Sequence, residues 1–364
     1  MRLTDLCTFL DSAVPISFQE GYDNSGLQTG IPEKEIRYGL ITLDVTEEVI
    51  DEAAEQGCEV IISHHPVIFN PLKRITGATF SERILLKAIK QDIAIYSAHT
   101  NLDVIGNGVS RKMAEKLNLR EIRVLAPLKN RLLKLVTYVP VANLEKVRNA
   151  VFAAGAGVIG NYDYCGFAVT GTGSFRGGDN TNPYVGEKGK IHFEQEIRFE
   201  TILFSHIKER VIDALLKAHP YEEVAYDFYS IENDNIYSGM GCTGLLPDPL
   251  PKGEFLKLVS SVFGARGIRH TMPARKKISR VAVCGGAGGA LVNDAIKSGA
   301  DAYITADIRY HSFLEAGHKI LIADIGHYES EKFSTEILYD LIIKKFPTFA
   351  LRFSKINTNP INYQ

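Results

Sequence analysis

Residues 38–66, YGLITLDVTEEVIDEAAEQGCEVIISHHP, alternate between apolar runs and an amphipathic segment. The apolar runs predict buried strands, and the amphipathic segments predict helices. Continued to residue 98, the predicted order is strand 38–45, helix 47–56, strand 59–63, helix 83–90 and strand 93–98. Strands that alternate with helices favour a parallel sheet, so we expect an α/β fold.

The same order of elements returns after residue 280. The predicted elements there are strand 281–284, helix 290–298, strand 302–305, helix 310–316, strand 320–325 and a long helix at 330–345. We therefore expect two similar α/β halves, residues 1–126 and 233–364, which together form one metal-binding unit.

Residues 127–232, between the two halves, have a different pattern with longer apolar alternations. They predict strand, helix, strand, strand, helix and strand in that order, with a Gly-rich turn region at 171–189 between the two middle strands. This order is typical of a ferredoxin-like α+β module. We interpret the segment as an inserted domain.

The composition of the chain is that of an ordinary globular protein. Of its 364 residues, 45% are hydrophobic and 23% are charged, and the formal net charge is −2. Such a balance provides no general attraction for nucleic acid or for anionic membranes, so we expect neither as a partner. The five cysteines are far apart and form no C-x-x-C pair, which argues against disulfides and against a thiolate zinc site.

The N-terminal segment also bears on where the protein is found. Asp5 and Asp11 interrupt the stretch that would need to be apolar in a secretory signal. No apolar stretch approaches the roughly 18 residues of a membrane span. We expect a cytoplasmic protein.

Three polar segments follow predicted strands, and each carries potential metal ligands. They are Ser63-His64-His65-Pro66, His99-Thr100-Asn101-Leu102-Asp103 and Gly326-His327-Tyr328-Glu329-Ser330-Glu331. Loops at the carboxyl ends of strands converge on one crevice in an α/β sheet. Each segment alone has an ordinary interpretation, such as a surface His pair or a helix-capping carboxylate, but the three together favour a shared site.

The adjacent pair His64 and His65 indicates that this site holds two ions. Neighbouring side chains on an extended backbone point to opposite sides, so both can be ligands if they serve different ions or if the chain turns at Pro66. We expect His327 at the entry of a helix that begins near Ser330, with Glu331 in its first turn. A carboxylate such as Glu331 can bridge two cations.

The proposed ligands supply nitrogen and oxygen but no sulfur; they are His64, His65, Asp103, His327 and Glu331. This donor set suits zinc, manganese, iron or cobalt. We expect two divalent ions per subunit, with zinc first and Mn²⁺ or Fe²⁺ as alternatives. Five ligands cannot fill two coordination shells, which leaves positions for water or substrate.

The motifs SHHP, HTNLD and GHYESE, together with GYDNSGLQTG at 21–30, resemble the family of GTP cyclohydrolase 1 type 2 homologues, also described as Ngg-interacting-factor-like dinuclear metal proteins. The resemblance covers roughly residues 1–126 and 234–364. It implies metal ligands at the same five positions. It also places His99 and His311 in motifs that line the family's site, and we expect these two histidines to act in catalysis or on the substrate.

The inserted segment resembles the trimer-forming domains of the CutA and PII type, notably through HPYEEVAYDFY at 219–229. Family members with this insertion look like toroidal homohexamers whose metal sites face an internal cavity. The resemblance therefore implies a homohexamer that takes a small-molecule substrate or ligand.

Two kinds of function remain open at this point. The first is a metal-dependent hydrolase that acts on a nucleotide-like or phosphorylated substrate through a metal-bound hydroxide, with His99 or His311 carrying the proton. The second is a ring-shaped, metal-dependent ligand-binding or regulatory protein without turnover. Fold and metal set alone do not define a substrate.

Two weaker motifs complete the candidate list. The glycine-rich segment 285–289 follows a strand and precedes a helix, so its N–H groups could hold a phosphate, although tight packing is the default interpretation. Asp307 and His311, four residues apart, would share a helix face, which fits either a proton relay or a surface pair.

Overall fold

The computed structural model describes residues 1–129, 131–272 and 275–364. Contacts between residues divide the chain into two compact units. Unit 1 comprises Met1–Pro127 and Ile236–Gln364, and unit 2 comprises Leu128–Asn235. Each unit is described by itself below.

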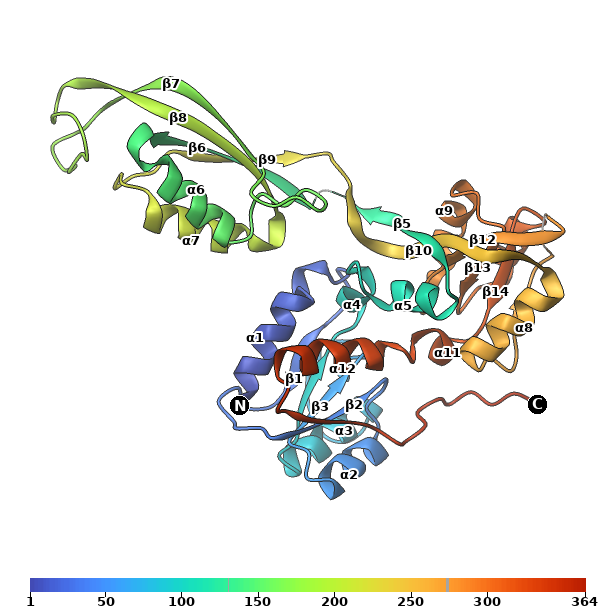
Figure 1. The fold of residues 1–364 in the computed structure, drawn as a ribbon. Coiled ribbons are helices and arrows are strands. Elements are labelled where there is room, and N and C mark those ends of the chain that lie inside the picture. Colours follow the sequence, from blue (N-terminus) through green and yellow to red (C-terminus); the bar gives the residue numbers. More distant parts are fainter. Residues whose placement is uncertain (130, 273–274) are drawn as a thin grey trace. The chain divides into compact units, whose positions relative to one another are not determined.

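The first sheet of unit 1 has the strand order β1-β4-β3-β2-β15. Its strands are β1 (Gly26–Thr29), β2 (Tyr38–Thr42), β3 (Val60–Ser63), β4 (Ala94–Ser97) and β15 (Ala350–Phe353). The four strands from β4 to β15 are parallel, and only the edge strand β1 runs antiparallel. The helices of this half are α1 (Leu3–Ala13), α2 (Glu47–Glu55), α3 (Phe80–Lys90), α4 (Thr100–Val104) and α5 (Val109–Lys116) (Figure 1).

The second sheet of unit 1 has the order β11-β14-β13-β12-β10-β5. Its strands are β5 (Arg120–Leu128), β10 (Asn235–Pro251), β11 (Arg269–His270), β12 (Lys277–Val283), β13 (Ala302–Thr305) and β14 (Leu321–Asp324). Strands β12, β13 and β14 are parallel. The helices are α8 (Lys252–Phe263), α9 (Val292–Lys297), α10 (Tyr310–Ala316), α11 (His327–Glu331) and α12 (Ser334–Lys345). The prediction of a mixed α/β fold is confirmed.

Local sequence signals explain where the helices of the first half begin. The side chain of Thr46 accepts a hydrogen bond from the N–H of Val49 at the start of α2. Thr79 does the same for the N–H of Glu82 at the start of α3. Such N-caps satisfy donors that the first turn of a helix leaves without partners.

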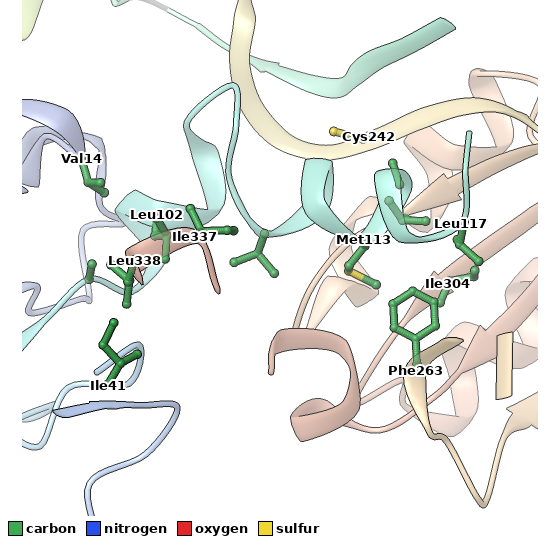
Figure 2. Close-up of a cluster of buried hydrophobic side chains, with 14 of the residues drawn as sticks. Val14, Ile41, Leu102, Met113, Leu117, Cys242, Phe263, Ile304, Ile337 and Leu338 are labelled. Atoms are coloured by element: carbon green, nitrogen blue, oxygen red, sulfur yellow. The ribbon is translucent and has the colours of Figure 1, made fainter. Parts of the chain in front are cut away.

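One large core extends through both halves of unit 1. It includes Leu3 and Leu6 of α1, Leu102 of α4, Ile304 of β13 and Leu338 of α12, all with no exposed surface. Figure 2 shows part of this core. The side chains drawn there extend from Val14, Ile41 and Ile337 to Met113, Leu117, Cys242 and Phe263. Because one continuous core joins the two halves, the strand ends of both can be held in fixed positions.

The last predicted helix differs from the observed one. The sequence predicts a single helix from 330 to 345, whereas the chain forms the short helix α11 and then α12. His327 is therefore the first residue of α11 and Glu331 the last, four positions later, so their side chains share one face. Strand β2 also ends at Thr42, three residues earlier than predicted.

Unit 2 is a four-stranded antiparallel sheet with the order β7-β8-β6-β9. Its elements are β6 (Leu132–Pro140), α6 (Leu144–Ala153), β7 (Gly166–Arg176), β8 (Ile191–Phe204), α7 (Lys208–Ala218) and β9 (Tyr226–Ile231) (Figure 1). This is the β-α-β-β-α-β arrangement of ferredoxin-like modules. Side chains of both helices form its core with the sheet, among them Val151, Phe199 and Leu215.

None of the helices in the described part of the chain combines the length and the apolar character that crossing a membrane requires.

Candidate metal centre

Polar residues from both sheets of unit 1 meet at the carboxyl ends of parallel strands. His64 and His65 follow β3 directly, and His99 precedes α4 just beyond β4. His327 and Glu331 lie on α11, which comes after β14 of the other sheet. The ring centroids of His65 lie 5.0 Å from His64, 5.3 Å from His99 and 5.2 Å from His327. The four imidazoles thus form one histidine cluster.

The carboxylate of Glu331 occupies the centre of this cluster. Its Oε2 lies 2.8 Å from Nε2 of His65, 2.9 Å from Nε2 of His327 and 3.8 Å from Nε2 of His64. The Nε2 atoms of His65 and His327 are 3.3 Å apart. His64, His65 and Glu331 bring their ligand atoms within 4.8 Å of one another, a spacing that could hold a metal ion.

Two buried atoms of the site have no hydrogen-bond partner among the described residues: Nε2 of His64 and Oδ1 of Asp103. They lie 3.8 Å from each other. His64 is fully buried and Asp103 is 8% exposed. A buried polar atom without a partner costs free energy, and such atoms in a native structure call for an explanation such as an ion. These two atoms are where an imidazole and a carboxylate would coordinate a cation.

In His64, His65 and His327, the Nδ1 atom of the imidazole donates a hydrogen bond to an acceptor that fixes the ring. Nδ1 of His64 donates to the carbonyl oxygen of Ala98 at 2.8 Å. Nδ1 of His65 donates to Oδ1 of Asp44 at 2.6 Å, and Nδ1 of His327 donates to Oδ2 of Asp307 at 2.6 Å. Acceptors of this kind fix the tautomer of a ligand histidine and direct its Nε2 toward the metal.

His99 is held in the same manner at the edge of the cluster. Its Nδ1 donates to Oδ1 of Asp23 at 2.7 Å, and Oδ2 of Asp23 accepts the N–H of Thr100 at 3.0 Å. Burial opposes the charged form of Asp23, but the hydrogen bonds from His99 and Thr100 outweigh it and lower the pKa of this carboxyl. Asp23 is therefore an ionised acceptor that orients the His99 ring.

The electrostatics of the cluster favour added positive charge. Burial opposes protonation of His65, yet its hydrogen bonds to Asp44 and Glu331 raise its pKa to about 10. For His327, hydrogen bonds to Glu331 and Asp307 outweigh burial and raise the pKa to about 9. Burial lowers the pKa of His64, whose imidazole stays neutral and keeps a lone pair on Nε2.

The two carboxyls have opposite shifts. Burial, together with the charge of Glu331, raises the pKa of Asp103. Burial acts in the same direction on Glu331, but the neighbouring imidazoles of His327, His64 and His65 outweigh it and lower its pKa overall. A divalent cation would supply the charge that protons on His65 and His327 otherwise provide.

Of the predicted residues, His64, His65, His99, Asp103, His327 and Glu331 come together here. Among the described residues, His311 shares no hydrogen bond, ion pair or ring contact with them: it is exposed on α10, and its ring lies 5.6 Å from that of Tyr310, measured between centroids. Asp307, which the sequence pairs with His311, bonds to His327 instead. The role expected of His311 stays a prediction.

Asp44 and Gly286 are among the contributors that the sequence analysis missed. Asp44 holds His65, but the predicted strand at 38–45 includes it; the early end of β2 exposes its side chain to the site. Gly286 has a positive φ of 62°, and a Cβ built on it would overlap Oε1 of Glu331. The sequence did offer a signal for Asp44, because it is a polar residue near the end of a buried strand and just before a helix.

Three N–H groups of the glycine-rich segment 285–289 are occupied by protein atoms. Gly285 donates to Oγ of Ser110, Gly286 to Oγ of Ser330 and Gly288 to Oγ1 of Thr305. Donors that are satisfied within the protein are not available to a phosphate. The default interpretation of tight packing fits these contacts.

The C-terminal segment reaches the residues behind the cluster. Oγ1 of Thr358 donates to Oδ2 of Asp44 at 2.6 Å, the same carboxylate that holds His65. Nδ2 of Asn359 donates to Oε1 of Glu329 on α11 at 3.0 Å. Thr358 therefore acts on the site through Asp44.

The chain is similar to known proteins over almost its whole length. The model of the Duf34/NIF3 (NGG1p interacting factor 3) family matches residues 1–360. A protein described as GTP cyclohydrolase 1 type 2 homolog from Halalkalibacterium halodurans is 44% identical over 348 residues, which cover 94% of this chain and 93% of that protein. The Bacillus subtilis protein of the same description is 40% identical over 347 residues, with the same two shares.

Solved structures give the same result for the fold. The crystal structure of a Bacillus cereus protein related to NIF3 has a TM-score of 0.86 at 38% identity, and covers 100% of this chain and 99% of that one. That of a Staphylococcus aureus protein has a TM-score of 0.78 at 29% identity, with the same coverage.

Proposed function

The chain belongs to the Duf34/NIF3 family, and from that premise we propose that it is a dinuclear divalent-metal protein that hydrolyses a nucleotide-like or phosphorylated substrate. The proposed ligands are His64, His65, Asp103, His327 and Glu331. The observation that carries the proposal is the pair of buried, unpartnered ligand atoms, Nε2 of His64 and Oδ1 of Asp103, beside the imidazoles of His65 and His327, which contact Oε2 of Glu331.

The donor set fits zinc, with manganese and iron as alternatives, because it consists of imidazole nitrogens and carboxylate oxygens. The carboxylate of Glu331 contacts both His65 and His327, so it would help to hold both ions. When bound, a pair of divalent ions supplies Lewis acidity and lowers the pKa of a coordinated water.

The residues of the chain have separate tasks in this proposal. Ala98, Asp44 and Asp307 orient the three imidazoles through Nδ1. Asp23 orients His99 and leaves Nε2 of that ring as the atom that takes or gives a proton. His99 is 14% exposed, so the atom remains within reach of a substrate.

The test combines metal content with turnover. Protein loaded with Zn²⁺, Mn²⁺ or Fe²⁺ is assayed with GTP and related cyclic or phosphorylated compounds, beside His64→Ala and Glu331→Ala. Loss of bound metal and of turnover in both variants supports the proposal. The matched control is His318→Ala, which removes an exposed histidine outside the cluster and should keep metal and turnover.

The alternative function is a metal-dependent ligand-binding or regulatory protein. It is favoured by a large cavity in unit 2, lined by residues of that unit. Tight metal-dependent ligand binding with no turnover under any of the three metals would select this alternative over hydrolysis.

We propose that the protein assembles as a toroidal homohexamer, because the inserted segment resembles trimer-forming domains of the CutA and PII type. Sedimentation analysis of the purified protein tests it. A mass of six chains supports the proposal, and a stable monomer or dimer contradicts it.

A further inference from the structure

Unit 2 contains a cavity of about 600 Å³ that lies entirely within its own residues. It is lined by strands β7 and β8, by the connection between them at 177–190 and by residues 221–225 after α7. The hairpin of β7 and β8 is the long element of this unit in Figure 1. Cavities of several hundred Å³ are the size of those that hold small organic ligands.

Glycines form part of the cavity lining on β7. Gly171 and Gly173 lie two residues apart and pair with Glu196 and Glu194 of β8, so all four residues share one face of the sheet. Nothing lies within 4 Å of a Cβ built on Gly171, whereas one built on Gly173 would overlap the Glu196 carboxylate. Glycine weakens a strand interior and often marks a place where a ligand approaches closely.

The carboxylate of Glu196 lies against Gly173. Glu196 is only 8% exposed, and its Oε1 accepts a hydrogen bond from the hydroxyl of Tyr221 at 2.8 Å. No lysine, arginine or histidine forms an ion pair with Glu196 among the residues that the structure describes. A buried carboxylate without a cationic partner is costly, which makes a positively charged ligand favourable at this position.

Aromatic rings surround the same space. Tyr138, Phe175, Tyr184 and Tyr221 all line the cavity. The ring of Tyr221 lies 6.0 Å from Phe175 and 6.1 Å from Tyr184, measured between centroids. The electron-rich faces of such rings attract cations, most strongly where water is excluded.

The segment that carries Tyr221 is fixed on both sides. Nε2 of His219 donates to the carbonyl oxygen of Tyr138 at 3.0 Å, and its Nδ1 accepts the N–H of Tyr221 at 3.2 Å. The carboxylate of Glu222 accepts the N–H of Asn182 at 2.9 Å, which ties the 177–190 connection to this segment. The aromatic wall is therefore held in place in the structure.

From these contacts we propose that the cavity of unit 2 is a binding site for an organic cation, a protonated amine carried on an apolar or aromatic body. Glu196 is the counter-ion, the aromatic rings enclose the apolar body, and the surface at Gly171 gives the ligand room. The proposal is independent of turnover at the metal centre, because every residue of this site lies in unit 2.

The two arginines that line the cavity do not offset the negative charge of Glu196. Arg176 and Arg198 are exposed, and Nε of Arg198 forms its ion pair with Oε1 of Glu200 at 2.8 Å. Glu222 and Glu223 add further negative charge to the lining. An anionic ligand would have to approach three carboxylates, so we infer selectivity for cations.

Calorimetric titration of the full-length protein with tyramine tests the proposal. Two matched probes are N-acetyltyramine, which lacks the positive charge, and 4-hydroxyphenylacetate, which is an anion. We expect saturable binding of tyramine at one molecule per chain, and at least about tenfold weaker binding of the other two probes. The variant Glu196→Gln keeps an acceptor for Tyr221 and should lose the preference for tyramine.

A second variant tests the location without changing any charge. Gly171→Leu fills the open space with a side chain in an ordinary strand conformation and should abolish tyramine binding. The control Glu209→Gln removes an exposed carboxylate at the start of α7 and should bind as the parent protein does. The proposal is overturned by absence of tyramine binding, by equal binding of the anion, or by unchanged binding in both cavity variants.

Discussion

The backbone of Gly286 leaves the space in which the carboxylate of Glu331 lies. A Cβ on Gly286 would overlap Oε1 of Glu331, and the same Cβ would lie 3.5 Å from Cε1 of His327. A glycine in the loop after β12 of the second sheet thus determines whether the central carboxylate can reach the histidines that follow the first sheet.

Gly286→Ala should displace Glu331 and weaken binding of Zn²⁺ or Mn²⁺ by at least about tenfold, the effect typical of disturbed metal ligands. Competition with a chelating dye measures the affinity. The control is Gly299→Ala, because Gly299 also has a positive φ, 75°, but nothing within 4 Å of its Cβ position. Equal losses of affinity in both variants would assign the effect to backbone strain.

Thr358→Val should remove the hydroxyl that supports Asp44 and loosen the orientation of His65. We expect about tenfold weaker metal binding with an unchanged melting profile. Thr358→Ser keeps the donor and should restore the affinity. The control is Thr335→Val, because the hydroxyl of Thr335 donates to the carbonyl oxygen of Lys332, away from Asp44. Wild-type affinity in Thr358→Val would refute the prediction.

Glu82 should contribute to stability in a pH-dependent manner. Hydrogen bonds from Thr76 and Ala78 lower its pKa from 4.5 to about 2. Because the pKa is lower in the folded state, the contribution is complete above the unfolded pKa and is lost as pH falls toward about 2.

Urea unfolding of Glu82→Gln should therefore show a lower free energy of unfolding than wild type near pH 7, and a smaller difference near pH 3. Glu115→Gln, which alters an exposed carboxylate of an i,i+4 pair, is the reference. A difference that stays constant across this pH range would contradict the assignment.

Deletion of unit 2 should leave the metal content intact. All residues of the histidine cluster and their acceptors belong to unit 1. Strands β5 and β10, which lead into and out of unit 2, are neighbours in one sheet, so a short glycine linker can replace residues 128–235. Elemental analysis measures bound metal per chain, and a folded deletion variant without metal would contradict this division of roles.

Periodicity was sufficient to predict the parallel strands β2, β3, β4, β12, β13 and β14 and the helices that alternate with them. It did not predict the helices α1, α4, α5 and α8 or the strands β1, β5, β10, β11 and β15. Strand β13 has the predicted bounds, and α10 also matches. Apolar strands carry this signal because they are buried on both faces in a parallel sheet. The break between α11 and α12 was not visible, since residues 330–345 keep helical spacing on both sides of it.

The candidate ligands were accessible from the sequence because each follows an apolar strand. The supporting residues were not, because their roles depend on distant partners. Asp44 and Thr358 are 314 positions apart, and no local pattern pairs them. Gly286 matters because it has no Cβ, which leaves space for the Glu331 carboxylate. This role becomes visible only in the packing around Glu331.

The order of the ligand residues along the chain also determines when the cluster can form during translation. His64 and His65 leave the ribosome long before Glu331, from which His65 is 266 positions removed. Until α11 has emerged, the early histidines have no central carboxylate. A growing polypeptide therefore cannot assemble the complete ligand set before Glu331 has been added.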